Sequence, residues 1–408
     1  MPSFKTLSLF LSLAVSIANA QTPNYKGSLL IQPRLSAGKC LTAANNQDGA
    51  AVTISSCTGA DAQKWTFQNG QVTVFGDKCL DVTDGSRANG AKMQIWTCST
   101  NRNPNQQYWY TGDLHLSWTD HGKCLDLPNG DLTDGNRPQM WDCFGNNNNQ
   151  FWNVGYPANA LPDKSQIGQS GTNKCDTKNS ASSQCQTAWI NSADDFCLWA
   201  PPNPNEAIGD SEREEVAWCT KEDRGTRTIP NGTLKGVHFV KTPDYVQVTG
   251  TGDFTKINIK ANDEGGELDP HGADGNGNPI GGLVFGNSFG QNLQYHEWTS
   301  FISATDFCFR ACVGPNAATN CQHIYDVMGC QWNMPANYNP GVFENCQGDS
   351  AQPMGVYGTS TWYQGVSPTP SAHPIPSSSS CQAFPSVTAS PSTKKRGLER
   401  KYVRPVSW

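Results

Sequence analysis

The sequence predicts an all-β protein with two disulfide-stapled domains, and three observations support this prediction. A related motif occurs three times before residue 155. Each copy alternates short apolar stretches with turns rich in Gly, Asn and Asp, which is typical of short β-strands. The sixteen cysteines divide into six before residue 150 and ten after it, so each part can close its own disulfides.

The three copies each begin with Lys-Cys-Leu, at residues 39, 78 and 123. Each contains a Gln-x-Trp triplet, which reads "QKW" at 63–65, "QYW" at 107–109 and "QFW" at 150–152. One such unit is too small to bury its own apolar face, whereas three can close around a shared axis. We therefore expect Trp65, Trp109 and Trp152 to lie in a common core.

The cysteine spacing predicts one disulfide inside each copy. The paired positions are 17, 19 and 19 residues apart, which gives Cys40–Cys57, Cys79–Cys98 and Cys124–Cys143. We expect the ten later cysteines to pair among themselves, in a connectivity that the sequence leaves open. Zinc-ribbon pairs of the Cys-x-x-Cys type are missing, and no metal or cofactor is predicted.

Residues 27–155 resemble the ricin B-chain type of lectin domain, a β-trefoil also called carbohydrate-binding module family 13. The three triplets and the three matched cysteine pairs carry this resemblance. It implies a β-trefoil that binds carbohydrate. The second part, residues 156–365, resembles a cysteine-rich domain of secreted fungal proteins, which implies no particular activity.

A sugar-binding site needs a carboxylate, an amide and an aromatic plate, and copies two and three offer all three. In copy two, Met93 and Ile95 alternate with Gln94 and Trp96. Met93 and Ile95 should therefore face the core, and Gln94 and Trp96 should share the outer face. The resemblance implies two sites. Their residues are Asp81, Gln94, Trp96, Gln106 and Gln107 in copy two, and Asp126, Gln139, Trp141, Asn149 and Gln150 in copy three. Gln106 takes the place where the family usually has Asn.

Copy one retains the core residues but lacks the residues that a sugar needs. Val52 and Ile54 stay apolar, whereas Thr42, Thr53 and Ser55 replace the Asp, the Gln and the Trp. We expect no sugar site there. A purely structural interpretation stays open, in which Asp81 and Asp126 cap turns and the glutamines of the triplets hold turns in place.

The second domain is predicted to be β-rich, because "VHFV" at 237–240 and "DYVQVTG" at 244–250 alternate like strands. Three chemistries were weighed for it. A glycoside hydrolase would draw its two carboxylates from Glu212, Glu214, Glu215, Glu264, Glu267, Asp269 and Asp274. A calcium site would use Asp269, Asp274, Asn276 and Asn278. Copper chemistry needs a histidine at the mature N-terminus, where Gln21 is expected.

The ends of the chain predict secretion. Residues 1–20 have the form of a signal peptide, with an apolar run that ends in Ala-Asn-Ala. No later stretch is apolar enough to cross a bilayer. Residues 366–408 are expected to form a Pro/Ser-rich linker and a basic tail, and Asn231-Gly232-Thr233 is a sequon for N-glycosylation. Because the net charge is −6 although this tail is basic, the body of the protein is acidic, which argues against nucleic acid as a partner.

The sequence thus predicts a secreted, extracellular, lectin-like protein of fungal type. Its expected partner is carbohydrate, in the form of galactose-type or xylose-type glycans or polysaccharide. Two alternatives stay open. One is an enzyme whose trefoil tethers it to polysaccharide, and the other is a cell-wall or adhesion protein.

Overall fold

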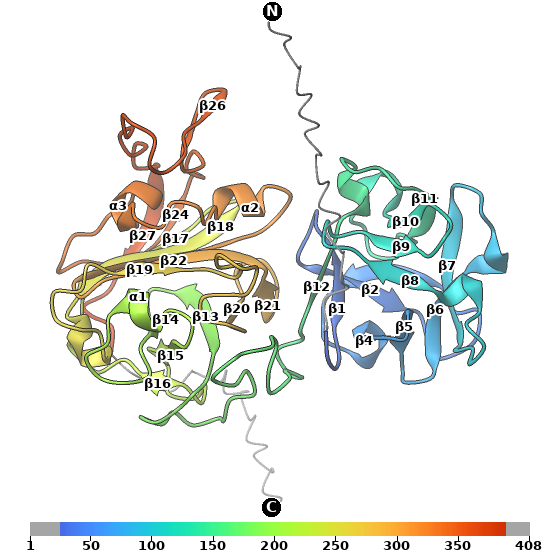
Figure 1. Ribbon diagram of the computed structural model, residues 1–408, viewed down its shortest axis with the longest axis horizontal. Helices are drawn as coiled ribbons and strands as arrows, with labels where there is room; N and C mark the ends of the chain where they lie inside the picture. Colours follow the sequence, from blue (N-terminus) through green and yellow to red (C-terminus); the bar gives the residue numbers. More distant parts are fainter. Residues whose placement is uncertain (1–24, 389–408) are drawn as a thin grey trace, which may run out of the picture.

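A computed structural model describes residues 25–388, so the predicted signal peptide and the tail beyond residue 388 lie outside it. Figure 1 shows two β-rich bodies side by side, with the chain from β12 to β13 running between them. The protein is all-β, as predicted.

The first body contains twelve strands in the three repeats. Eight of them form one sheet in the order β4-β5-β6-β7-β11-β10-β9-β8, while β1 pairs with β12 and β2 pairs with β3. The bounds are β1 Leu30–Pro33, β2 Lys39–Ala43, β3 Val52–Ser56, β4 Trp65–Gln68, β5 Gln71–Val74, β6 Lys78–Val82, β7 Ala91–Thr97, β8 Tyr108–Tyr110, β9 Leu116–Trp118, β10 Lys123–Asp126, β11 Gln139–Asp142 and β12 Trp152–Gly155.

The three repeats are joined in a closed ring by equivalent contacts. The lysine before the first cysteine of each copy contacts a turn residue of the preceding copy. Lys78 Nζ lies 3.0 Å from Asp48 Oδ1, Lys123 Nζ lies 2.6 Å from Asn89 Oδ1, and Lys39 Nζ lies 2.6 Å from Asp134 Oδ1. The third contact returns from copy three to copy one and so closes the ring.

The core of this body confirms the predicted alternation. Val52, Ile54, Met93, Ile95 and Met140 are all fully buried, and they point inward from β3, β7 and β11. One unit contributes too few of these side chains to bury an apolar face, which is why three must pack together.

The prediction that Trp109 lies in the core is wrong. Trp65 and Trp152 are fully buried, whereas Trp109 is 53% exposed. Tyr108 takes the core position in copy two, since side chains alternate along β8 and Tyr108 and Tyr110 both point inward.

The second body is built from two sheets packed face to face. Their orders are β16-β15-β14-β13-β20-β21 and β19-β22-β23-β18-β17-β24-β27. Trp199 of β14 meets Trp298 of β22 across the core, with ring centroids 5.8 Å apart. The bounds are β13 Thr187–Ser192, β14 Asp195–Ala200, β15 Val216–Cys219, β16 Arg227–Thr228, β17 Leu234–Lys241, β18 Tyr245–Gly252, β19 Gly266–Leu268, β20 Leu283–Gly286, β21 Leu293–Tyr295, β22 Glu297–Ile302, β23 Asp306–Cys312, β24 Phe343–Gly348 and β27 Ser378–Ala383.

The remaining elements are short. Strands β25 Val356–Tyr357 and β26 Ser360–Thr361 form a small hairpin, and the α-helices are α1 Ile208–Ser211, α2 Ala317–Asn320 and α3 Gly329–Asn333. Among residues 25–388, none of the helices has the length and apolar character needed to cross a membrane.

All sixteen cysteines lie within the described residues, and all are paired. The first six form Cys40–Cys57, Cys79–Cys98 and Cys124–Cys143, the same pairs that the spacing predicts. The later ten pair among themselves as Cys175–Cys185, Cys197–Cys219, Cys308–Cys330, Cys312–Cys321 and Cys346–Cys381. Disulfides therefore staple each body separately.

The segment predicted as a linker from residue 366 belongs in part to the second body. Residues 378–383 form β27, which pairs antiparallel with β24. The disulfide Cys346–Cys381 fixes this pairing, and backbone hydrogen bonds need no particular side chains, so a Ser-rich stretch still joins the sheet.

Candidate carbohydrate-binding sites

Copy two builds a carboxylate-centred hydrogen-bond network on the hairpin of β6 and β7. Asp81 lies directly opposite Gln94 in the strand pairing, and Gln94 Nε2 donates to Asp81 Oδ1 over 2.9 Å. Gln106 Nε2 donates to the other oxygen, Asp81 Oδ2, over 3.1 Å. Each carboxylate oxygen has two lone pairs, so Asp81 keeps acceptor capacity for sugar hydroxyls.

The environment of Asp81 perturbs its acidity. Burial raises the pKa of the Asp81 carboxyl above its ordinary value of 3.8, while the hydrogen bonds from Gln94 and Gln106 act in the opposite direction. The two amides thus stabilise an ionised carboxylate that burial disfavours.

Copy three repeats this arrangement on β10 and β11. Gln139 Nε2 donates to Asp126 Oδ1 over 3.0 Å, and the second oxygen accepts from Asn147 Nδ2 over 3.2 Å. Lys92 Nζ donates to Gln139 Oε1, which orients that amide toward Asp126. Sequence reasoning missed Asn147, because the resemblance points only to the amide pair next to the final aromatic residue.

Each network has an exposed indole close to it. Trp96 and Trp141 are 46% and 37% exposed. Each follows its glutamine by two residues on the same strand, so the indole and the amide lie on one face of the hairpin. An exposed indole beside a polar network suits a sugar, since the C–H face of the ring packs on the aromatic plane.

The amide pair predicted for copy two is shifted by one residue. In copy three, Asn149 and Gln150 lie in the 3₁₀ turn before the buried Trp152. The equivalent turn in copy two holds Asn105 and Gln106 before the buried Tyr108. Asn105, like Asn147, is therefore a candidate residue that sequence reasoning missed. The Asn-Gln pair common to both copies was the signal that could have located it.

Gln107, which the sequence placed in this site, lies elsewhere. A Cβ added to Gly70 would lie 2.9 Å from Gln107 Oε1, so this side chain lies against the turn between β4 and β5. The triplet Gln107-Tyr108-Trp109 is one residue out of register with the other two copies. The core residue of copy two is Tyr108, and Trp109 is not.

The aligned glutamines Gln63, Gln106 and Gln150 all hold the same turn in place. Each accepts from the backbone N–H of the residue after the second cysteine of its copy, at distances of 2.8, 2.9 and 2.8 Å. Each also donates to the carbonyl of the residue before that cysteine. The structural interpretation of the triplet glutamines is therefore correct for Gln63 and Gln150 and wrong for Gln107, because Gln106 holds the turn in copy two and also donates to Asp81.

Two glycines make room for the site asparagines. A Cβ at Gly85 would lie 2.7 Å from Asn105 Oδ1, and one at Gly130 would lie 2.8 Å from Asn149 Oδ1. Both glycines have a positive φ, which other residues rarely adopt. The turn glycine and the asparagine thus form a matched pair in copies two and three.

In copy one, the polar side chains at the equivalent positions hydrogen-bond to one another. Thr42 Oγ1 and Ser55 Oγ lie 2.8 Å apart, and Gln63 Nε2 donates to both oxygens over 3.1 Å. Ala62 stands where the other copies have the site asparagine. Copy one thus has no carboxylate, no exposed indole and no asparagine in this position.

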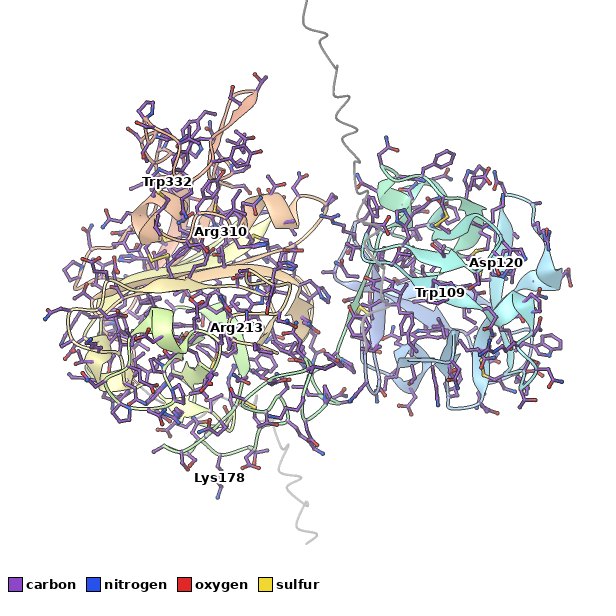
Figure 2. The ribbon with its side chains drawn as sticks, viewed as in Figure 1. Trp109, Asp120, Lys178, Arg213, Arg310 and Trp332 are labelled. Carbon is purple, nitrogen blue, oxygen red and sulfur yellow. A yellow bond between two sulfur atoms is a disulfide. The ribbon has the colours of Figure 1, made fainter. Side chains whose placement is uncertain are left out.

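A separate cavity of about 660 Å³ lies beside β8 in the trefoil. Trp109, Gln107 and Asp120 line it together with Arg102 and His121. Figure 2 labels Trp109 and Asp120 in this half of the molecule. An exposed indole with polar neighbours gives this cavity its own capacity to bind a ligand, apart from the two networks.

In the second body, the oxygens proposed for calcium are bound to a guanidinium. Arg213 Nη2 lies 2.8 Å from Asp274 Oδ2, and Arg213 Nη1 donates to Asn278 Oδ1 over 3.1 Å and to the carbonyl of Asn276. Asp269 Oδ1 accepts from two backbone amides. The loop thus forms its hydrogen bonds and an ion pair within the protein, and the calcium hypothesis stays untested.

The carboxylates proposed for a hydrolase are spread between core and surface. Glu215 and Glu267 are buried, and burial raises the pKa of both carboxyls well above the usual range. Glu214 and Glu264 are exposed. This distribution does not single out an acid and a base, and glycoside hydrolysis stays an untested hypothesis.

Comparison with known proteins identifies the domain and the relatives. The model of the ricin-type β-trefoil lectin domain matches residues 28–152 and, in a second register, 72–196. The chain is 53% identical over 247 residues to the appressorium protein ROW2 of Mycosarcoma maydis, covering 58% of this chain and 85% of that protein. It is 56% identical over 224 residues to the appressorium protein ROW1 of the same fungus, covering 54% of this chain and 53% of that protein.

Among solved structures, the chain is similar to the C-half of an earthworm R-type lectin in complex with GalNAc. The identity is 19%, the TM-score is 0.28, and the match covers 32% of this chain and 98% of the lectin. The ROW2 alignment is longer than the trefoil, so the similarity to ROW2 includes part of the second body. The chain carries a ricin-type β-trefoil lectin domain, a carbohydrate-binding type of domain, and belongs to the same family as the appressorium protein ROW2.

Proposed function

We propose that this chain is a secreted carbohydrate-binding protein with one sugar site in copy two and one in copy three. The trefoil spans residues 27–155, and the cysteine-rich domain that follows it starts at residue 156 and includes β27, which ends at Ala383. The copy-two site consists of Asp81, Gln94, Trp96, Asn105 and Gln106, and the copy-three site of Asp126, Gln139, Trp141, Asn147, Asn149 and Gln150.

The observation that carries this proposal is the contrast between the copies. Copies two and three each keep a buried carboxylate that is bound by two amides beside an exposed indole. In copy one, hydroxyl groups that hydrogen-bond to each other replace this carboxylate. Copy one forms the same hairpin with Thr42 at this position, so the fold does not require an aspartate there. Burying a carboxylate costs free energy, which a ligand-binding role explains.

Secretion is supported by the leader-like residues 1–20, by the eight disulfides and by the appressorium relatives. Disulfides of this density persist in oxidising compartments. Asn231 is exposed in the turn before β17, where an N-glycan can be attached. Galactose-type and xylose-type glycans are the ligand classes to screen first.

The sites are tested by substituting the two carboxylates. Asp81→Ala and Asp126→Ala should each remove one of two binding sites for the best glycan from an array. The double variant should lose binding while its thermal unfolding stays cooperative. Isothermal titration of the secreted protein measures the number of sites directly.

Thr42→Ala is the matched control, because it changes the equivalent residue of copy one. It should leave both the number of sites and the affinity unchanged. If the double variant still binds with wild-type strength, the proposal is wrong. Trp109→Ala then decides whether the ligand occupies the cavity beside β8.

A further inference from the structure

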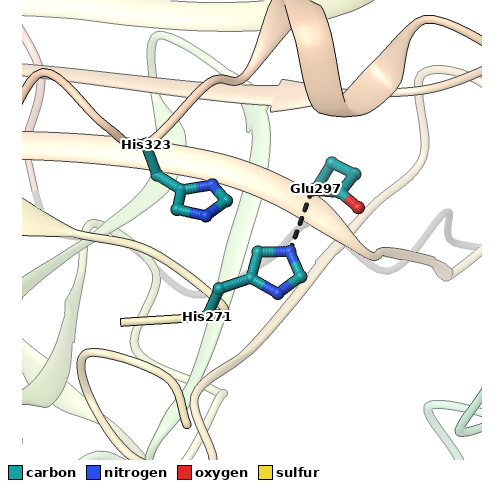
Figure 3. Close-up of side chains that lie close together, drawn as sticks. All are labelled: His271, Glu297 and His323. Atoms are coloured by element: carbon teal, nitrogen blue, oxygen red, sulfur yellow. Dashed lines mark hydrogen bonds and ion pairs between the residues drawn. The ribbon is translucent and has the colours of Figure 1, made fainter. Parts of the chain in front are cut away.

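Three side chains from distant parts of the sequence converge in the second domain. Glu297 begins β22, His271 lies in the loop after β19, and His323 follows α2. One ligand atom from each residue lies within 4.8 Å of the others. Figure 3 shows the three side chains close together, with a dashed line for the hydrogen bond between His271 and Glu297.

The backbone holds these three residues in position. Glu297 is paired with Cys312 in the β22–β23 ladder, and Cys312 is bonded to Cys321, two residues before His323. This disulfide therefore fixes His323 next to the strand that carries Glu297.

The loop that carries His271 is also held rigidly. Asp269 Oδ1 accepts from the backbone N–H of His271 over 2.7 Å, and Asp269 pairs with Asn278 to close the loop. All three side chains thus project from constrained backbone, as a preorganised site requires.

Hydrogen bonding alone does not account for the cluster. His271 Nε2 lies 3.1 Å from Glu297 Oε2, which uses one imidazole and one carboxylate oxygen. The ring of His323 stacks on that of His271 with centroids 4.6 Å apart, and His323 Nδ1 is buried without a hydrogen-bond partner. A buried nitrogen without a partner costs free energy, and a bound cation would satisfy it.

Further acidic groups lie near the cluster. Burial, the largest effect, lowers the pKa of His323, while Asp269 and Asp326 act in the opposite direction and favour positive charge there. The other grouping of possible ligands in the described residues is Glu344 with Cys346 and Cys381, but its sulfurs are bonded to each other. Of these two groupings within residues 25–388, the histidine cluster is the one whose ligand atoms are not joined by a covalent bond.

The cluster borders a cavity of about 430 Å³ between the two domains. His271 and Glu297 line it from the second domain, and Tyr110 and Asn153 line it from the trefoil. Cavities at domain interfaces are frequent sites for small ligands.

We propose that His271, Glu297 and His323 bind one divalent metal ion of the zinc class. Two imidazoles and one carboxylate are a donor set that zinc takes at sites where the fourth position is left for water or a ligand. The interdomain cavity is the route by which such a ligand reaches that position. This gives the second domain a site that does not depend on the sugar sites of the trefoil.

The test is titration of the chelator-treated full chain with Zn²⁺ by calorimetry, with metal content measured after dialysis. The wild type should bind one equivalent, and Zn²⁺ should raise its melting temperature. His271→Ala, His323→Ala and Glu297→Gln should each weaken binding by about 100-fold or more, since even outer-shell partners are worth roughly 10- to 100-fold. Ca²⁺ and Mg²⁺ should bind far more weakly, since they prefer oxygen ligands.

The matched control is His121→Ala, which removes a histidine from the trefoil and should leave zinc binding intact. Glu297→Gln keeps the size of the side chain, so it separates loss of a ligand from loss of folding. The proposal is overturned if the wild type takes up no zinc, if the three variants bind zinc as the wild type does, or if Ca²⁺ binds equally well.

Discussion

Asp81 is only 4% exposed, yet both of its oxygens are bound by amide groups that hold it ready to accept further hydrogen bonds. The equivalent Thr42 instead shares its hydroxyl with Ser55 and Gln63. At the level of single residues, therefore, the same strand position can hold either a carboxylate or a hydroxyl within a stable hydrogen-bond network. Only the carboxylate leaves unused lone pairs toward a ligand.

Gly130→Ala should weaken sugar binding in copy three. The new Cβ would lie 2.8 Å from Asn149 Oδ1, so the site asparagine must move. The variant should also lose roughly 1–2 kcal/mol of stability, because alanine is strained at positive φ. Binding is measured by titration in the Asp81→Ala background, where only the copy-three site remains.

Gly122→Ala is the control for backbone strain. Gly122 has the same φ of +63° as Gly130, but a Cβ there meets nothing within 4 Å. It should lose a similar amount of stability and keep its sugar affinity. Equal losses of affinity in the two variants would contradict a role for Asn149 in the site.

Sugar binding in copy two should weaken as the pH falls, starting above the range expected for an ordinary aspartate. Burial raises the pKa of Asp81, and the carboxylate must be ionised to accept hydroxyl protons. Protonation therefore begins at a higher pH than the ordinary value of 3.8 would give. Titrations of the Asp126→Ala variant from pH 7 to pH 4 measure this site alone. If the affinity does not change between pH 7 and pH 4, the assignment of Asp81 is refuted.

Most residues of the candidate sites could be predicted from the sequence, because strand alternation and the Cys-Leu-Asp pattern place them. Asn105 was missed because "NQQYW" can be read in two registers and an aromatic residue ends each, although the Asn-Gln pair of copy three favours the register that includes it. The choice depends on which aromatic side chain the core accepts, and that is a property of packing between copies. Asn147 was missed for a related reason, because its bond to Asp126 crosses a turn of irregular length.

At the level of elements, the hairpins β2–β3, β6–β7 and β10–β11 are equivalent units. Each begins with a lysine that reaches the turn of another copy, and each is stapled by its own disulfide. The period of the repeat predicted these hairpins. The parallel pairing of β13 with β20 could not be predicted, because it joins segments almost a hundred residues apart.

Removing the disulfide of copy one should lower stability and leave sugar binding intact. The bridge Cys40–Cys57 closes a loop of 17 residues, which corresponds to about 3 kcal/mol in the chain-entropy account. Denaturant unfolding of Cys40→Ala/Cys57→Ala measures the loss, and titration with glycan measures the two sites.

Cys79→Ala/Cys98→Ala is the matched comparison, since its loop is nearly as long and Trp96 lies opposite Cys79 in the strand pairing. This variant should lose similar stability and, in addition, affinity at copy two. Loss of binding in both variants would show that the disulfides maintain the whole trefoil and that no copy depends on its own bridge.

At the scale of the whole molecule, the trefoil and the second domain are in direct contact. A Cβ added to Gly155 of β12 would lie 2.6 Å from His296 Cε1 of the second domain. The sequence predicted two domains but not this contact, because neither a change of composition nor a repeat indicates which surfaces meet. The interdomain cavity that reaches His271 is a product of the same contact.

The two proposed sugar sites share one sheet, because β7 of copy two pairs directly with β11 of copy three. A single site on such a surface is expected to bind with a Kd near 1 mM, or about −4 kcal/mol. A polysaccharide that reaches both sites turns the second contact into an intramolecular one, which can raise the affinity by roughly 10²- to 10⁴-fold.

Asp81→Ala and Asp126→Ala should therefore act differently on small and large ligands. For a monosaccharide, each variant should halve the number of sites and leave the Kd of the remaining site unchanged. For the polymer, each should lower the affinity by about 100-fold or more, since avidity is lost with either site. Calorimetry with the monosaccharide and affinity electrophoresis in polysaccharide gels measure the two effects. A twofold loss on the polymer would mean that the sites act independently and that their placement on one sheet confers no avidity.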